Sequence, residues 1–282
     1  MVFNYISWNA NPEIFSLGAL SVRWYGLLFA GGFYVGYLIM ERFFKKEKVP
    51  VAILDKLAMY MIISTVIGAR LGHCLFYEPA YYLSNPLEIL YIWHGGLASH
   101  GAAIGIIFAL FLFSKYQKPD FWWTIDRIVI VVALAGFFIR MGNLMNSEIY
   151  GHATSLPWGF VFVKDNQTIP RHPTQIYEAL SYLALFFVLR WYYYKKDGLP
   201  NNGFLFGTFL IVLFSIRFVV EFLKETQVNF EKGMLLNMGQ LLSIPFIIAG
   251  IIIVYLSNQN KLRYKFNWKE DFEKEINEKK SK

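Results

Sequence analysis

Seven uninterrupted apolar segments constrain this 282-residue chain more than any other feature of its sequence. Each is near the roughly 20 residues that a helix needs to cross the hydrocarbon layer of a bilayer. Hydrophobic residues make up 56% of the chain, whereas a soluble protein with a large core would break its apolar runs sooner. We therefore expect an all-α integral membrane protein. The segments are 19–40, 53–76, 97–114, 125–141, 174–194, 203–223 and 236–256.

Basic residues predict how these segments are oriented. Lys and Arg cluster in "ERFFKKEK", "KYQKPD", "KKDG" and the C-terminal tail, whereas the alternate connections contain few of them. The positive-inside rule then puts the N-terminus outside and the C-terminus in the cytoplasm. We expect a seven-helix membrane domain over 1–256, a small ordered extracytoplasmic cap inserted at 142–173, and a basic cytoplasmic tail at 257–282. The net charge of +7 is explained by these faces and does not indicate nucleic-acid binding.

With this topology, several polar side chains fall in the outer half of the bilayer. Arg70, Arg140 and Arg217 lie toward the outer ends of their segments, and Glu221 follows Arg217 at the i,i+4 spacing of a local ion pair. Tyr25, His100 and His172 lie at outer ends or connections. The simpler explanation is that they form structural pairs between helices. A whole layer of charged groups inside a membrane instead favours a functional cavity.

The ligand class follows from the charges. Arginines without carboxylates at the same depth predict an anion, and the guanidinium fork suits phosphate. At the outer headgroup level, the abundant anion is the phosphate of a phospholipid. The signatures of other membrane enzymes are missing, because the chain has no Gly-x-Ser-Gly nucleophile and no clustered aspartates for a metal. The single cysteine, Cys74, excludes an intramolecular disulfide and favours a packing role.

The stretch "FIRMGNLMNSEIYGHAT" at 138–154 resembles the signature of the prolipoprotein diacylglyceryl transferases. Similar matches are "SVRWYGLLFAGGF", "GARLGHCLFYE", "HGGLASHGA", "RHPTQIYEA" and "IRFVVEF", in the order of the family. The resemblance implies a multi-pass protein of the bacterial inner membrane with its active site toward the outer leaflet. It further implies transfer of the diacylglyceryl group of phosphatidylglycerol to the lipobox cysteine of a preprolipoprotein. That reaction gives a thioether, releases glycerol phosphate and needs no cofactor or metal.

Carried over by position, the family's residues become Tyr25, His100, Arg140, Asn143, Glu148, Gly151, Arg217 and Glu221. We expect Arg140 and Arg217 to hold the phosphate and His100 to accept the thiol proton, with Arg70 and His172 as further substrate-binding candidates. Tyr25 either orients the lipid or shares a proton path.

Supporting roles fall to the neighbours of the arginines. Glu148 and Glu221 are expected to orient the arginines and Asn143, while Gly142 and Gly151 permit a tight turn. The alternatives are a non-enzymatic phospholipid-binding or transport protein, and another membrane transferase with a different acceptor.

Overall fold

All seven apolar segments are helices in the computed structural model. The structure describes residues 5–18, 20–92, 95–96, 98–117, 119–225 and 234–262. The long helices are α1 Trp24–Lys46, α2 Val51–Phe76, α4 Ser99–Gln117, α5 Phe121–Met145, α6 Thr174–Lys195, α7 Phe204–Glu221 and α8 Met238–Asn258. Five of them, α1, α2, α5, α7 and α8, are long and apolar enough to cross a membrane. This is the architecture of a helical, multi-pass membrane protein.

The first segment begins later than the apolar run suggests. Residues 20–23 form strand β3 (Leu20–Arg23), which pairs antiparallel with β2 (Glu13–Leu17). Gly18, with a φ of 61°, occupies the left-handed region at the hairpin turn, where a Cβ would be strained. At its other end α1 continues to Lys45 and Lys46, whose charges suit the carbonyl end of a helix. The predicted boundaries of 19 and 40 are therefore wrong by five and six residues, about one and a half helical turns each.

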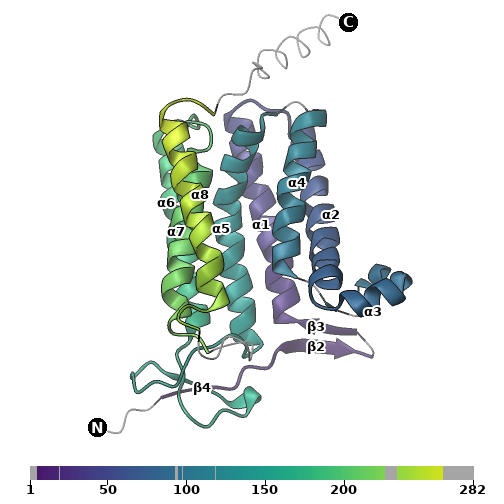
Figure 1. Ribbon diagram of the computed structural model, residues 1–282, viewed down its shortest axis with the longest axis vertical. Helices are drawn as coiled ribbons and strands as arrows, with labels where there is room; N and C mark the ends of the chain where they lie inside the picture. The colour runs from purple at the N-terminus through teal and green to yellow at the C-terminus, as the bar shows by residue number, and fades with distance from the viewer. Residues whose placement is uncertain are drawn as a thin grey trace, which may run out of the picture. The chain divides into compact units, whose positions relative to one another are not determined.

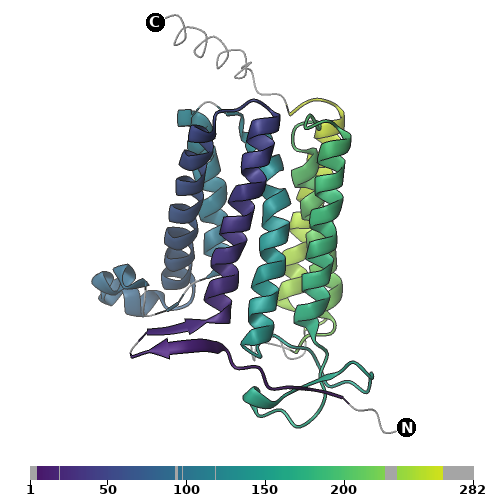
Figure 2. The ribbon, with the colours of Figure 1, turned by 180° about the vertical axis from the view of Figure 1, so that it is seen from behind.

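Most of the candidate site lies in one compact unit, which comprises residues 1–40 and 126–262. In this unit, glycines let neighbouring helices approach closely, as is typical of membrane helices. A Cβ on Gly32 of α1 would lie 3.6 Å from the backbone of Ala135 on α5. Likewise, a Cβ on Gly207 of α7 would lie 2.9 Å from the carbonyl oxygen of Gly250 on α8. Figures 1 and 2 show α6, α7 and α8 side by side.

Asp126 fixes the start of α7 from a neighbouring helix. Its buried carboxylate on α5 accepts hydrogen bonds from the backbone N–H groups of Gly203, at 2.7 Å, and Phe206, at 2.8 Å. These are amide groups at a helix N-terminus, which have no partner within their own helix. The contact ties α7 to α5 at the end of α7 remote from Glu221, and thereby helps to set the register of the helix that carries Arg217.

The segment 142–173 is ordered around a small apolar core. Strand β1 (Ile6–Trp8) pairs in parallel with β4 (Phe160–Phe162), with Ile6 opposite Phe160. Leu144 and Phe162 are buried there, and the indole N–H of Trp8 donates to the carbonyl oxygen of Leu144 at 3.0 Å. Two-stranded pairs add β structure to a fold that the sequence predicts as all-α. Figure 1 shows β4 in the loops that follow α5.

The second unit includes residues 41–125 and is built on a close pair of helices, α2 and α4. Gly68 and Gly72 on α2 face Gly101 and Gly105 on α4. A Cβ on Gly101 would lie 2.2 Å from the carbonyl oxygen of Gly68, so the backbones touch without intervening side chains. The short helix α3 (Pro79–Ser84) and the 3-10 helix η1 (Pro86–Leu90) follow α2 in the chain (Figure 1).

Candidate functional site

The end of α5 carries a chain of three polar side chains. The Nη1 of Arg140 donates to Oδ1 of Asn143 at 3.1 Å, and the Nδ2 of Asn143 donates to Oε1 of Glu148 at 2.7 Å. The Nδ2 of Asn146 also donates to this carboxylate oxygen, at 3.2 Å. Asn143 thus has its acceptor toward the cation and its donor toward the anion. The amide is held in one orientation and fixes the direction of the guanidinium.

The turn after α5 is built differently from the expectation. Gly142 lies inside the helix, where its missing side chain accommodates Tyr25: a Cβ there would be 2.8 Å from Cδ2 of the tyrosine. The residues with positive φ are Ser147, at 56°, and Ile149, at 60°. A β-branched residue in this region is a strained exception. The prediction of a turn at Gly142 is therefore wrong, and close packing explains this glycine.

Helix α6 holds that strained turn in place. The Nε2 of Gln175 donates to the carbonyl oxygen of Glu148 at 2.6 Å, and the hydroxyl of Thr174 donates to that of Ile149 at 2.8 Å. Both side chains are fully buried. Strained backbone persists where the surroundings over-determine it, and it is frequent at functional sites.

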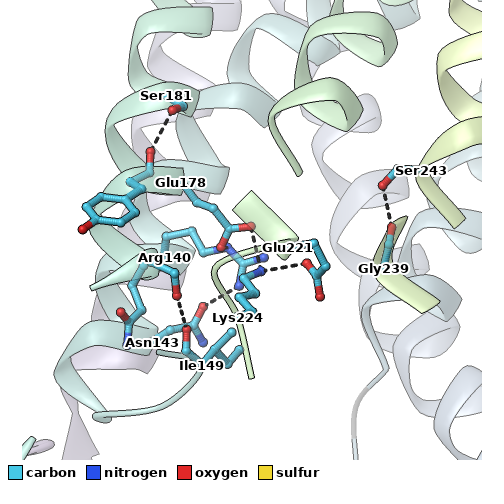
Figure 3. A network of polar contacts seen from close by, with 12 residues as sticks. Arg140, Asn143, Ile149, Glu178, Ser181, Glu221, Lys224, Gly239 and Ser243 are labelled. Carbon is cyan, nitrogen blue, oxygen red and sulfur yellow. Dashed lines mark hydrogen bonds and ion pairs between the residues drawn. The ribbon is translucent and has the colours of Figure 1, made fainter. Parts of the chain in front are cut away.

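Four ionic groups, of which Arg140 is half-buried and the other three are buried, continue from Arg140 toward the end of α7 (Figure 3). The Nε of Arg140 pairs with Oε2 of Glu178 at 2.9 Å. The Nζ of Lys224 pairs with the other oxygen of Glu178 at 3.0 Å and with Oε2 of Glu221 at 3.3 Å. The predicted local pair between Arg217 and Glu221 is wrong, because Glu221 pairs with Lys224.

Among the residues that the structure describes, the charges in this cluster balance, which corrects the expectation of arginines without matching carboxylates. The cations are Arg140, Arg217 and Lys224, and the carboxylates are Glu148, Glu178 and Glu221. An anion site therefore depends on unused donors and not on an excess of positive charge. Arg217 offers such a donor: its Nε is buried and has no hydrogen-bond partner among the residues that the structure describes. Both Arg140 and Arg217 interact electrostatically with Tyr182 on α6.

Gly151 permits a close crossing of two backbone segments. Its N–H donates to the carbonyl oxygen of His172 at 2.9 Å, and the next N–H, of His152, donates to that of Leu223 at 2.8 Å. A Cβ on Gly151 would lie 2.2 Å from the carbonyl oxygen of Leu223. Gly151 does not have a positive φ. A glycine is therefore needed here because there is no room for a side chain, and not because of a turn conformation.

Tyr25 and His172 both belong to the unit that carries this motif. Tyr25, the second residue of α1, packs on Gly142 and interacts electrostatically with Glu148 and Arg140. The Nδ1 of His172 lies 3.2 Å from the hydroxyl of Tyr177, which accepts from the indole N–H of Trp158 at 2.9 Å. Partial burial, assisted by nearby His152, lowers the pKa of His172 below its usual 6.5.

Arg70 and His100 belong to the second unit. Arg70 is buried on α2 and donates to backbone carbonyls in the connection to α4: Nε to Ile89 at 3.0 Å, Nη1 to Gly95 at 2.6 Å and Nη2 to Glu88 at 2.5 Å. Its three nitrogens hold that loop. His100 is exposed in the first turn of α4, next to Gly101 at the helix contact.

Sequence reasoning gave no role to two members of the ionic cluster. Glu178 lies in the quoted stretch "RHPTQIYEA" at the start of the fifth segment, and Lys224 lies one residue beyond the sixth segment. The available signal was spacing, since Lys224 follows Glu221 by three residues and Arg217 by seven, close to two helical turns. Lys224 therefore lies on the same side as Arg217 and Glu221 if the helical spacing is continued beyond the last residue of α7.

Comparisons with known proteins agree with the resemblance in the motifs. The family profile described as prolipoprotein diacylglyceryl transferase matches residues 12–256. A relative from Tolumonas auensis is 50% identical over 258 residues, covering 91% of this chain and 99% of the relative. Others from Chloroherpeton thalassium and Porphyromonas gingivalis are 44% and 42% identical and cover 90% and 93% of this chain, and 95% and 98% of their own. All three are named phosphatidylglycerol–prolipoprotein diacylglyceryl transferase.

Proposed function

We propose that this chain, which belongs to the prolipoprotein diacylglyceryl transferase family, transfers the diacylglyceryl group of phosphatidylglycerol to the lipobox cysteine of a preprolipoprotein. A carbon–sulfur bond forms at the glycerol carbon as the carbon–oxygen bond to the phosphate breaks. Glycerol phosphate leaves with the electron pair of that bond, and the thiol gives up its proton. The names of the relatives support both substrates.

The observation that carries the proposal is the pair of guanidinium groups around Tyr182. Arg140 is fixed by contacts at Nε and Nη1, and Arg217 has a buried Nε that donates to none of the described residues. A phosphate that gains charge as it leaves is stabilised by donors already in place in a water-poor site. Planar guanidinium groups bind phosphate oxygens with two parallel hydrogen bonds.

The other residues then take supporting parts. Asn143 and Glu148 keep Arg140 oriented, and Gly151 keeps the loop of the motif against the end of α7. His100 is our candidate for accepting the thiol proton, because an imidazole titrates near neutral pH. Tyr25 orients the lipid or shares the proton path. The contacts of Arg70 favour loop support, with substrate binding as its second role.

We further propose seven spans, with α4 and α6 completing the five helices of highest hydropathy. The distribution of Lys and Arg supports an external N-terminus, a cytoplasmic C-terminus and 142–173 as an external cap in a bacterial inner membrane. Most of the basic tail, from 263 onward, lies outside the described residues. A reporter fused after residue 160 tests the orientation, and cytoplasmic activity of that reporter would overturn it.

Transfer of labelled diacylglycerol from phosphatidylglycerol to a lipobox peptide tests the function directly. Membranes containing the protein should form a thioether-linked product, and Arg140→Ala should abolish it. A lipid-binding or transport protein would exchange phospholipid but yield no product. A control peptide with serine in place of the lipobox cysteine should remain unmodified.

A further inference from the structure

Lys224 is an unusual residue for the place that it occupies. Its side chain is buried, with a residue exposure of 5%, just beyond the last residue of α7. Its backbone bridges to Gly151, so the lysine is attached to the loop of the motif as well as to α7. A charged side chain is buried only when it is paired, and this ammonium group contacts two carboxylates.

The carboxylate of Glu178 is divided between two cations. One oxygen faces Nζ of Lys224 at 3.0 Å and the other faces Nε of Arg140 at 2.9 Å. Glu178 has no solvent exposure, so water does not compete for these oxygens. Lys224 therefore keeps one oxygen of Glu178 away from the guanidinium of Arg140.

Arginine and carboxylate groups otherwise prefer two parallel hydrogen bonds. If Glu178 turned both oxygens to Arg140, it would occupy guanidinium donors that the phosphate of the lipid requires. The balance of charge would also change: without Lys224, the cluster holds two arginines against three glutamates. An incoming phosphate would then meet a cluster that is already negative.

We propose that Lys224 is a positioning residue of the transfer reaction. It holds Glu178 and Glu221 so that Arg140 keeps donors directed at the phosphate. The inference rests on the proposed function and extends it to a residue that does not itself touch the reacting atoms.

The test uses the transfer assay, with KM for phosphatidylglycerol and kcat measured separately for each variant. Lys224→Met should raise KM by roughly 10- to 100-fold, the scale of effect that displacement of a substrate-positioning group produces. Lys224→Arg should restore most of the affinity. Glu178→Gln combined with Lys224→Met should also recover affinity, because glutamine leaves no charged carboxylate to engage Arg140. Lys164→Met, which removes an exposed lysine in 142–173, is the matched control and should match the unmodified protein.

Each result either supports the positioning role of Lys224 or overturns it. An unchanged KM in Lys224→Met would overturn the proposal. So would a fall in activity that tracks thermal unfolding and is not relieved by Glu178→Gln, because Lys224 would then serve only the fold. Lys224→Gln is measured in parallel. If neither Lys224→Met nor Lys224→Gln accumulates as folded protein, that result also overturns the proposal. Failure of the unmodified protein to form product would instead contradict the proposed function.

Discussion

Asn143 donates a 2.7 Å hydrogen bond to the carboxylate of Glu148 while its own carbonyl oxygen accepts from Arg140. The asparagine side chain offers a donor and an acceptor on one planar group. The orientation of the arginine thus depends on an amide that cannot be reversed without placing two acceptors or two donors face to face.

Asn143→Asp should therefore be more harmful than its size suggests. The new carboxylate would face Glu148 and would compete with phosphate for Arg140. We expect kcat/KM for transfer to fall by about 100-fold, or roughly 2.7 kcal/mol of transition-state stabilisation. Asn143→Ala is the comparison. If aspartate proved no worse than alanine, the bridging role of the amide would be wrong.

Gly151→Ala should disrupt the attachment of the motif loop to the end of α7. The added methyl group would lie 2.2 Å from the carbonyl oxygen of Leu223, which belongs to backbone and cannot swing aside. Overpacking of this kind costs about 1–3 kcal/mol, and thermal unfolding in detergent should show the loss together with reduced transfer. Gly31→Ala in α1, where a Cβ would meet nothing within 4 Å, is the control and should leave both unchanged.

The contact between α2 and α4 gives a third test, on stability. Gly101→Ala would place a Cβ 2.2 Å from the carbonyl oxygen of Gly68, so the two helices must separate. We expect the midpoint of thermal unfolding to fall, again by the equivalent of about 1–3 kcal/mol. Gly26→Ala has open space around the added atom and serves as the control. An unchanged midpoint in Gly101→Ala would show that the helices are not packed backbone to backbone.

The lowered pKa of His172 predicts a dependence of stability on pH. Because burial favours the neutral imidazole in the folded state, the unfolded chain takes up its proton first as the pH falls below 6.5. The contribution of this group to stability is complete above pH 6.5 and is lost on acidification toward its folded pKa. His172→Gln should flatten that part of a stability profile. Chemical unfolding at several pH values measures the free energy of unfolding against pH. If His172→Gln gave the same slope as the unmodified protein, the assignment of this pH dependence to His172 would be wrong.

The sequence predicts the helices of this fold well because apolar run length is a local property. It misplaces the start of α1 because 20–23 carries no local signal that separates a strand from a helix, and the hairpin with Glu13–Leu17 decides between them. The components Arg140, Asn143 and Glu148 lie within nine residues, so their association is local as well. The pairing of Glu178 with Lys224 joins residues 46 positions apart, and no periodicity reports such a contact.

The bond between Trp8 and Leu144 also has a consequence for biosynthesis. The indole is made 136 residues before its acceptor, which at about 5–20 residues per second corresponds to a wait of roughly 7–27 s. During that time strand β1 is without β4, and α1, α2 and α4 have already been synthesised. We therefore expect the segment that carries β1 to settle later than α1, which follows it directly in the chain. Proteolysis of translation intermediates should find it cleavable until β4 has emerged.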